Sequence, residues 1–284
     1  MDELEIQKLI YTLVQSQEAI YPNMKKYFDK SYTEKMSREF YENSKLKEEI
    51  FNTKSVISTE EFKNFYLATG IDVDGRLKLL QEACEHMQRG IIKYITYARS
   101  IPGFSTICQE DKLNLIKAAR FEYWMLGHYL HYNPELDVNV GYEIKQTKSD
   151  SIKMWGSEEA WNTVNAFSKS LLDLNLSFEE IALLRGIVIL FTDRCQLKEP
   201  EKVESLQLEL IKCLKYLIKH VHPHQEKRFY RYFDRLIAIR KLTELNKKQN
   251  AMLEKFQMSI IKNYPLMYEC ISEDITNVDQ RDFI

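Results

Sequence analysis

Apolar residues recur at three- and four-residue spacing along most of this chain, the pattern of amphipathic α-helices. The clearest stretch runs from residue 71 to 101, with an apolar face formed by Leu80, Ala83, Cys84, Met87, Ile91, Tyr94, Ile95 and Ala98. The sequence Ser-Ile-Pro-Gly at 100–103 should end this helix, because proline disfavours helical geometry at the preceding residue and glycine permits a turn. A second helix is predicted from 109 to about 132. Residues 121–126 are nearly apolar all round, which indicates burial on every side.

The same reading predicts further helices at 4–20, from 157, at 181–191 and at 229–263. Residues 23–69 are expected to form short helices and loops over the body, with a separate small domain as the alternative. Weak alternation at 137–151 is the only strand signal and predicts one short β-hairpin. Two Ser-x-x-Glu sequences, Ser58–Glu61 and Ser177–Glu180, predict capped helix starts.

Composition agrees with a helical protein in a reducing compartment. The 284 residues include only eight Gly and six Pro, and the net charge of -2 argues against a nucleic-acid-binding surface over the whole chain. The five Cys form no Cys-x-x-Cys pair, so neither a disulfide frame nor a zinc finger is expected. No apolar run has membrane-spanning length, and the first residues do not open a signal peptide. We expect an intracellular protein with no membrane partner.

The chain lacks the common motifs for nucleotide binding, zinc proteolysis and serine hydrolysis. We therefore predict that it is not an enzyme and that it has no catalytic residue, no metal and no cofactor. His220, His222 and His224 form the one metal-like cluster, and they lie beside Pro223, where surface histidines are common. Zinc-dependent turnover or a tightly bound metal would revive the enzyme alternative.

Several short sequences resemble the signature of nuclear hormone receptor ligand-binding domains. The matching positions are Tyr97-Ala98-Arg99, Phe104, Ile107, Asp111 and Leu115-Ile116-Lys117, and, much later, Phe191-Thr192-Asp193-Arg194 with the helix start at Pro200. Two positions depart from the family pattern. Arg99 replaces the usual Lys with a planar guanidinium, and Lys112 replaces a Gln, which makes the region more basic.

The chain is most similar to subfamily-one receptors of the retinoid-related orphan, ecdysone, vitamin D and nematode steroid types. This resemblance implies an all-α fold, a three-layer antiparallel helical sandwich of about twelve helices with one short β-hairpin. It also implies N-terminal and hinge-proximal helices at 1–70 that pack on a ligand-binding core at 71–275. A disordered tail is expected at 276–284.

Residues 266–271, Leu-Met-Tyr-Glu-Cys-Ile, match the family's activation-helix pattern, which predicts a terminal helix at 265–272. In the family, this helix completes a groove that binds Leu-x-x-Leu-Leu helices of coactivators. The resemblance thus assigns groove roles to Arg99, Lys117, Leu266, Met267 and Glu269. The two cations would hold the last carbonyls of the docked helix, and Glu269 its first amides. So short a helix is marginal alone, and a frayed turn is the alternative.

The family's helix positions also imply a mostly apolar ligand pocket lined by Cys84, Met87, Gly90, Ile91, Tyr94, Trp124, Met125, His128, Phe167 and Leu253. Soft Met and Cys side chains suit a non-covalent, sterol-like ligand. His128 is either a ligand contact or a satisfied core histidine. Many relatives carry an arginine where this chain has Gly127, so no acid-binding cation is expected there. A pocket filled by the protein's own side chains stays open as an alternative.

Arg194 is expected to pair with buried Glu122, a pattern that the family associates with heterodimers with retinoid X-type receptors. An ordinary buried ion pair is the alternative. DNA would be contacted only through a two-zinc module, whose paired Cys spacing this sequence lacks. The implied function is a ligand-regulated transcription factor in the nucleus, with shuttling to the cytoplasm as an option. A ligand-independent helical domain that recruits coregulators is the alternative.

Overall fold

The computed structural model describes residues 1–51, 57–225 and 227–272, which are helical apart from one small sheet. The predicted all-α class with a short antiparallel sheet is therefore confirmed. The chain divides into two compact units: unit 1 holds residues 1–28, 91–130 and 170–243, and unit 2 holds 29–90, 131–169 and 244 onward. The predicted boundaries near 70 and 275 stay predictions, and the tail at 276–284 lies outside the described residues.

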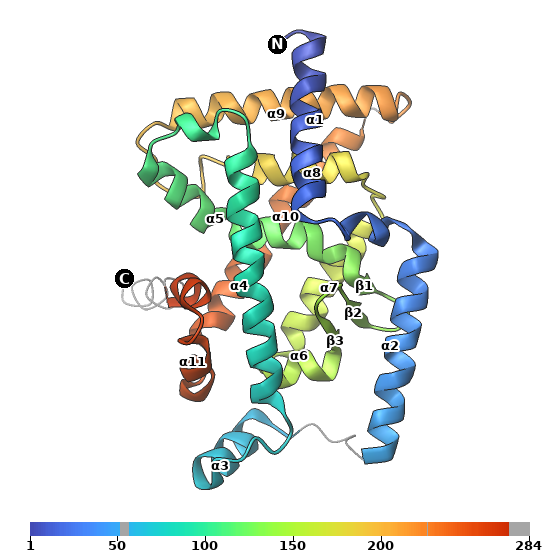
Figure 1. The fold of residues 1–284 in the computed structure, drawn as a ribbon, viewed down its shortest axis with the longest axis vertical. Coiled ribbons are helices and arrows are strands. Elements are labelled where there is room, and N and C mark those ends of the chain that lie inside the picture. The colour runs from blue at the N-terminus through green and yellow to red at the C-terminus, as the bar shows by residue number, and fades with distance from the viewer. Residues whose placement is uncertain (52–56, 226, 273–284) are drawn as a thin grey trace. The chain divides into compact units, whose positions relative to one another are not determined.

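Unit 1 is built around a helix that is buried on all sides. Its elements are α1 (Glu3–Ile20), η1 (Met24–Phe28), the second part of α4 (Arg76–Ser100), η2 (Phe104–Thr106), α5 (Gln109–His128), α8 (Phe178–Ile189), α9 (Pro200–Val221) and the first part of α10 (Arg228–Ala251). α8 packs against α1, α5 and α9, and α9 lies crosswise to α1 (Figure 1). Every residue of α8 except Glu179 is buried, as its apolar sequence predicts.

Unit 2 combines helices with the sheet. Its elements are α2 (Lys30–Phe51), α3 (Thr59–Thr69), the first part of α4, β1 (Tyr132–Asn133), β2 (Val138–Val140), β3 (Lys145–Thr147), α6 (Lys148–Trp155), most of α7 (Glu158–Leu172), the end of α10, α11 (Lys255–Ile261) and the helical residues 265–272. The short helix η3 (Tyr129–His131) precedes β1. The strands are antiparallel in the order β1-β2-β3, and α2 contacts all three.

The predicted turn after α4 has the expected geometry. α4 ends at Ser100, and Gly103 has a φ of 82°, a left-handed conformation that glycine adopts without strain. The side chain of Leu206 packs where a Cβ at Gly103 would lie, so the turn also needs a small residue. Both predicted capping boxes, at Ser58 and Ser177, are present. Among the described helices, none is long and apolar enough to span a membrane.

The expectation of short helices and loops at 23–69 is wrong for α2, which is one helix of 22 residues. Its many Lys and Glu residues have high helix propensity, and pairs such as Lys45–Glu48 (2.9 Å) support a helix that buries little apolar surface. Sequence periodicity underrates such a helix, because the pattern depends on a buried face.

Two other boundaries differ from prediction. The helix expected at 109–132 stops at His128, and β1 adds a strand to the predicted hairpin, because two strand residues are too few to give a pattern. The run at 229–263 is two helices, not one. α11 begins after Glu254, which forms a capping box with Gln257 and so favours a new helix start.

Candidate functional site

In unit 1, α4 and α5 each carry an exposed apolar side chain and, further along the same helix, a cation. Ile92 and Arg99 lie two turns apart on one face of α4, and both are exposed. Leu113 and Lys117 lie one turn apart on α5, with Leu113 exposed and Lys117 half-buried. Ile92 is 54% exposed and Leu113 46%. We call these four residues the α4–α5 surface.

Buried tyrosines hold this part of α4 in place. The Tyr94 hydroxyl donates to the Ile116 carbonyl of α5 at 2.8 Å, and its ring centroid lies 4.4 Å from that of Tyr123. The Tyr97 hydroxyl donates to the Ala182 carbonyl of α8, and burial raises the pKa of Tyr97 above its usual range. Tyr97 therefore stays a neutral donor, and the two hydroxyl groups fix α4 against its neighbours. In unit 1, Tyr94 thus joins two helices, whereas the resemblance placed it on a pocket wall.

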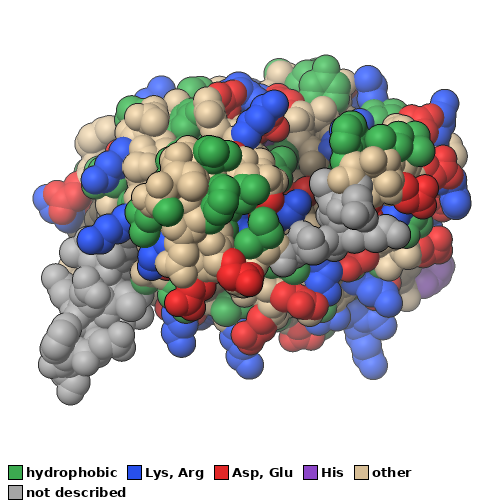
Figure 2. Space-filling model, turned by 90° about the horizontal axis from the view of Figure 1, so that it is seen from below, with side chains coloured by type: hydrophobic (Ala, Val, Ile, Leu, Met, Phe, Trp, Pro, Cys, Tyr) green, Lys and Arg blue, Asp and Glu red, His purple; other side chains and the backbone are tan. Residues whose placement is uncertain are grey.

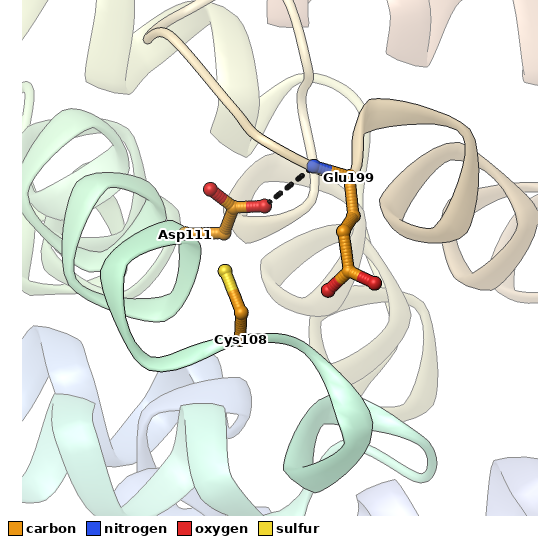
Figure 3. Close-up of side chains that lie close together, drawn as sticks. All are labelled: Cys108, Asp111 and Glu199. Atoms are coloured by element: carbon orange, nitrogen blue, oxygen red, sulfur yellow. Dashed lines mark hydrogen bonds between the residues drawn. The ribbon is translucent and has the colours of Figure 1, made fainter.

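Asp111 fastens the start of α5 to the segment before α9. One carboxylate oxygen accepts from the Lys198 N–H at 2.8 Å, and the other from the Glu199 N–H at 2.9 Å, the bond drawn in Figure 3. Burial alone would raise the pKa of Asp111, but the two backbone donors and the Cys108 thiol hold it below its usual 3.8. The signature aspartate is therefore an ionised structural tie.

Cys108, Asp111 and Glu199 bring three potential metal-ligand atoms within 4.8 Å of one another (Figure 3). Both Asp111 oxygens already accept backbone hydrogen bonds, and Glu199 pairs with Lys202 at 3.6 Å. A bound metal would have to break the hydrogen bonds that Asp111 accepts from the Lys198 and Glu199 N–H groups. We therefore assign these three residues a structural role and not a metal site. Within the described residues, His220, His222 and His224 do not converge on a metal site.

The second signature segment forms the expected ion pair within unit 1. Arg194 Nη1 lies 2.6 Å from Glu122 Oε1, and the Glu122 side chain is almost fully buried. The guanidinium also lies over the ring of Phe191, 5.1 Å from its centroid. The two side chains therefore form a charge-assisted hydrogen bond in the interior of unit 1.

The expectation that no cation lies near Gly127 needs correction. Arg185 of α8 is buried, and its Nη2 occupies the space that a Cβ at Gly127 would take. Sequence comparison along one helix misses this residue, because the cation comes from a different helix.

In unit 2, three predicted pocket residues share one apolar cluster with the terminal helix. The buried members are Leu80, Ala83, Cys84, Met154, Ile261, Met267 and Ile271, and Met87 and Leu253 pack against them. Met267 is only 4% exposed and packs inside this cluster, and its expected place on the coactivator groove stays a prediction. Residues 267 and 271 lie one turn apart and face inward, whereas Glu269 is exposed and Leu266 half-buried.

The other predicted pocket residues have varied surroundings. In unit 2, Gly90 and Phe167 are half-buried; in unit 1, Met125 is buried and Ile91 and His128 are half-buried. Trp124 is 37% exposed and stacks on His128 with ring centroids 4.0 Å apart. The prediction that residues 121–126 are buried on every side therefore fails at Trp124. Sequence reasoning also missed Ile92 and Leu113, although apolar residues outside the periodic buried face were a usable signal.

Comparison with known proteins matches residues 77–256 to the family model of the ligand-binding domain of nuclear hormone receptor. Retinoic acid receptor gamma of Xenopus laevis is 30% identical over 167 residues, covering 58% of this chain and 34% of the relative. Human nuclear receptor ROR-beta is 32% identical over 151 residues, covering 53% and 32%. Nuclear receptor subfamily 1 group D member 2 of Rattus norvegicus is 28% identical over 155 residues, covering 55% and 27%.

The chain spans about a third of the length of these curated relatives. The matched region contains both signature segments, the Asp111 tie and the Glu122–Arg194 pair. The relatives are subfamily-one receptors, as the resemblance predicted, and they are transcription factors rather than enzymes. This chain therefore belongs to the family of nuclear hormone receptor ligand-binding domains.

Proposed function

We propose that this chain is the ligand-regulated, coregulator-recruiting part of a nuclear transcription factor. The observation that carries the proposal is the α4–α5 surface, on which Ile92 and Leu113 are exposed, with Arg99 two turns beyond Ile92 and Lys117 one turn beyond Leu113. The partner that fits is an amphipathic helix with a Leu-x-x-Leu-Leu face.

The chemistry of the surface suits that partner. Each buried aliphatic side chain contributes about 1.5–3 kcal/mol, so the contacts of Ile92 and Leu113 supply most of the affinity. The last turn of any helix leaves carbonyls without intrahelical partners, and a nearby cation stabilises it by about 0.3–1 kcal/mol. Arg99 and Lys117 therefore set the direction and register of the bound helix more than its affinity.

Fluorescence polarisation with a labelled Leu-x-x-Leu-Leu peptide tests this proposal. Arg99→Ala and Lys117→Ala should each weaken binding several-fold, and Ile92→Ser should weaken it about tenfold or more, because an apolar contact is lost. The matched control is Lys219→Ala, which removes an exposed cation from α9. The family resemblance adds that Glu269→Ala should weaken binding as well. Unchanged peptide affinity in all the surface variants would refute the assignment.

The ligand that we propose is hydrophobic, sterol-like and non-covalent. Soft apolar residues support this class, since Cys84, Met87 and Leu253 lie together in the cluster of unit 2. A hydrophobic ligand that binds only the folded chain must raise its melting temperature.

We also infer a heterodimer with a retinoid X-type receptor, in the nucleus, with DNA contacted through another module of the full receptor. Support comes from the Glu122–Arg194 pair and from α10, where Tyr230 is 68% exposed and Ile237 is 62% exposed. These two residues lie two turns apart on one face, as a helix–helix interface requires.

One observation favours the alternative of a ligand-independent coregulator-binding domain. Met267 and Ile271 fill the cluster around Cys84 with the protein's own side chains. On this alternative, no lipid extract raises the melting temperature, although the peptide still binds the α4–α5 surface.

A further inference from the structure

Helix α2 of unit 2 buries little of its own surface. Only Ser37 among its 22 residues is buried, while Leu46 is 54% exposed and Ile50, one turn later, is 64% exposed. Figure 2 views the molecule from the C-terminal end of α2, and apolar side chains gather there beside acidic and basic ones. A long helix with neighbouring exposed aliphatic side chains presents a surface for contact with another protein chain.

The two aliphatic side chains line a groove between α2 and the sheet. Six of the seven residues that line this groove come from α2, and the seventh is Lys145 of β3. Asn43 is at the centre of the six, because the other five lie three, four or seven residues from it and so share its side of the helix. We call these six residues the α2 face: Glu39, Phe40, Asn43, Leu46, Lys47 and Ile50.

The α2 face is complementary to a second copy of itself that runs in the opposite direction. In an antiparallel helix pair with two-fold symmetry, each residue meets the one that lies equally far on the other side of the axis. With the axis at Asn43, Phe40 of one copy meets Leu46 of the other. In the same way Glu39 of one copy meets Lys47 of the other, so two ion pairs form. Apolar positions therefore meet apolar ones, and opposite charges meet.

The flanking residues extend this match. Ile50 lies seven residues after Asn43 and would meet Met36, which lies seven residues before it and is half-buried. Glu39 lies 3.9 Å from the exposed Lys35 of its own chain, a long contact that a partner can replace at little cost. Asn43 would meet its own copy, where two amides can donate to each other. A single asparagine at the centre of a helix pair fixes its register.

We propose that the α2 face is a homotypic interface, through which two copies of this chain pair by antiparallel α2 helices about a two-fold axis at Asn43. The proposal goes beyond the proposed function, because it uses neither the α4–α5 surface nor the exposed residues of α10. One helix from each copy buries less than the roughly 1,200 Å² of stable interfaces, so the dissociation constant is about micromolar or weaker. Such a contact acts between receptors that are already held close together.

A cysteine on the two-fold axis tests the geometry in the full chain. Asn43→Cys should form a disulfide-linked dimer under mild oxidation, because residues on the axis meet at the short distance that a disulfide needs. Lys45→Cys is the matched control, since Lys45 is also exposed but lies on the opposite side of α2. Non-reducing electrophoresis should show the dimer forming about tenfold faster or more with Asn43→Cys than with Lys45→Cys or the wild-type chain.

Charge reversal tests the register. Sedimentation velocity measures self-association in a reference protein that carries Ile237→Asp, so that the exposed residues of α10 do not contribute. Glu39→Lys and Lys47→Glu should each weaken self-association about tenfold, because each sets two pairs of like charges across the axis. A mixture of these two variants should recover the affinity of the reference protein, because every lysine then meets a glutamate.

Three results would overturn the proposal. The first is a dimer that forms equally fast with Asn43→Cys and Lys45→Cys, or with neither. The second is a mixture that associates no better than its two components, because the charged residues then do not meet across the axis. The third is a reference protein that stays monomeric up to about 100 μM. Each of these results is independent of peptide binding at the α4–α5 surface, which is measured separately.

Discussion

Arg185 is a buried cation surrounded by aromatic rings. Its guanidinium carbon lies 4.8 Å from the ring centroid of Tyr21 and 4.7 Å from that of Tyr123, and Nη1 donates to Gln17 at 3.2 Å. Within the described residues, no carboxylate pairs with it. The faces of the rings offer the compensating negative potential. Gly127 makes this arrangement possible, because any Cβ there would collide with the guanidinium.

Gly127→Ala should therefore destabilise the protein. The substitution gains up to about 1 kcal/mol of helix propensity, but it displaces a buried, desolvated cation, and we expect a net loss of about 2 kcal/mol or more. Gly90→Ala is the matched control: a Cβ at Gly90 of α4 meets nothing within 4 Å, so only the propensity gain remains. Urea denaturation of both variants measures the two free energies of unfolding. A neutral or stabilising Gly127→Ala would show that Arg185 moves aside without cost.

At the scale of elements, Glu180 performs two tasks at once. It completes the capping box that begins α8, and it accepts hydrogen bonds from Arg228 and Tyr232 of α10. Burial alone would raise its pKa, but the hydrogen bonds from Arg228, Tyr232 and the Ser177 N–H lower it below the usual 4.5. The glutamate is thus ionised when folded and joins two helices distant in sequence.

The lowered pKa of Glu180 gives an acid dependence of stability. Because the folded carboxylate holds its proton less tightly than the unfolded one, its contribution is present above pH 4.5 and lost as pH falls through the lower folded value. Glu180→Gln should cost about 3 kcal/mol or more at pH 7, since it leaves Arg228 buried without its partner. That difference should shrink below pH 4.5. His222 lies 3.5 Å from Glu180. Both the reference protein and the Glu180→Gln variant therefore carry His222→Gln, so that this histidine does not contribute to the difference in their free energies of unfolding. A difference that is constant from pH 7 to 3 would contradict this account.

At the scale of the whole molecule, the exposed face of α10 bears on assembly. Tyr230 and Ile237 are isolated large apolar residues on an otherwise polar helix face with Asp234 and Lys241. On this face Asp234 lies between the two apolar residues and Lys241 lies one turn beyond Ile237, so a partner would have to match both the apolar and the charged positions.

Mixed with a retinoid X-type ligand-binding domain, the wild-type chain should sediment as a heterodimer. Ile237→Asp should abolish the complex, because it places an unpaired charge at the centre of the interface. Ile92→Ser, in the α4–α5 surface, serves as the control and should leave the heterodimer intact. A wild-type chain that stays monomeric in the mixture would remove the support that we draw from the Glu122–Arg194 pair.

The sequence by itself determined the features that depend on neighbours along the chain. Periodic apolar residues placed α4 and α8, the Pro-Gly turn ended α4 at Ser100, and Ser-x-x-Glu marked two helix starts. Short signature segments were enough to identify the family, because each combines a local helix or turn with a fixed polar residue such as Asp111. These signals are local, so they survive without knowledge of the fold.

Only the tertiary structure decided which side chain fills which space. Arg185 reaches Gly127 from another helix, Trp124 faces outward from an apolar run, and Met267 packs into a buried cluster with Cys84 and Met154. For Arg185 and Met267 the partners are remote in sequence, and the burial of all three side chains is settled by the packing of whole elements. Periodicity gives the face of a helix but not what that face meets, since contact across the chain depends on how the helices cross.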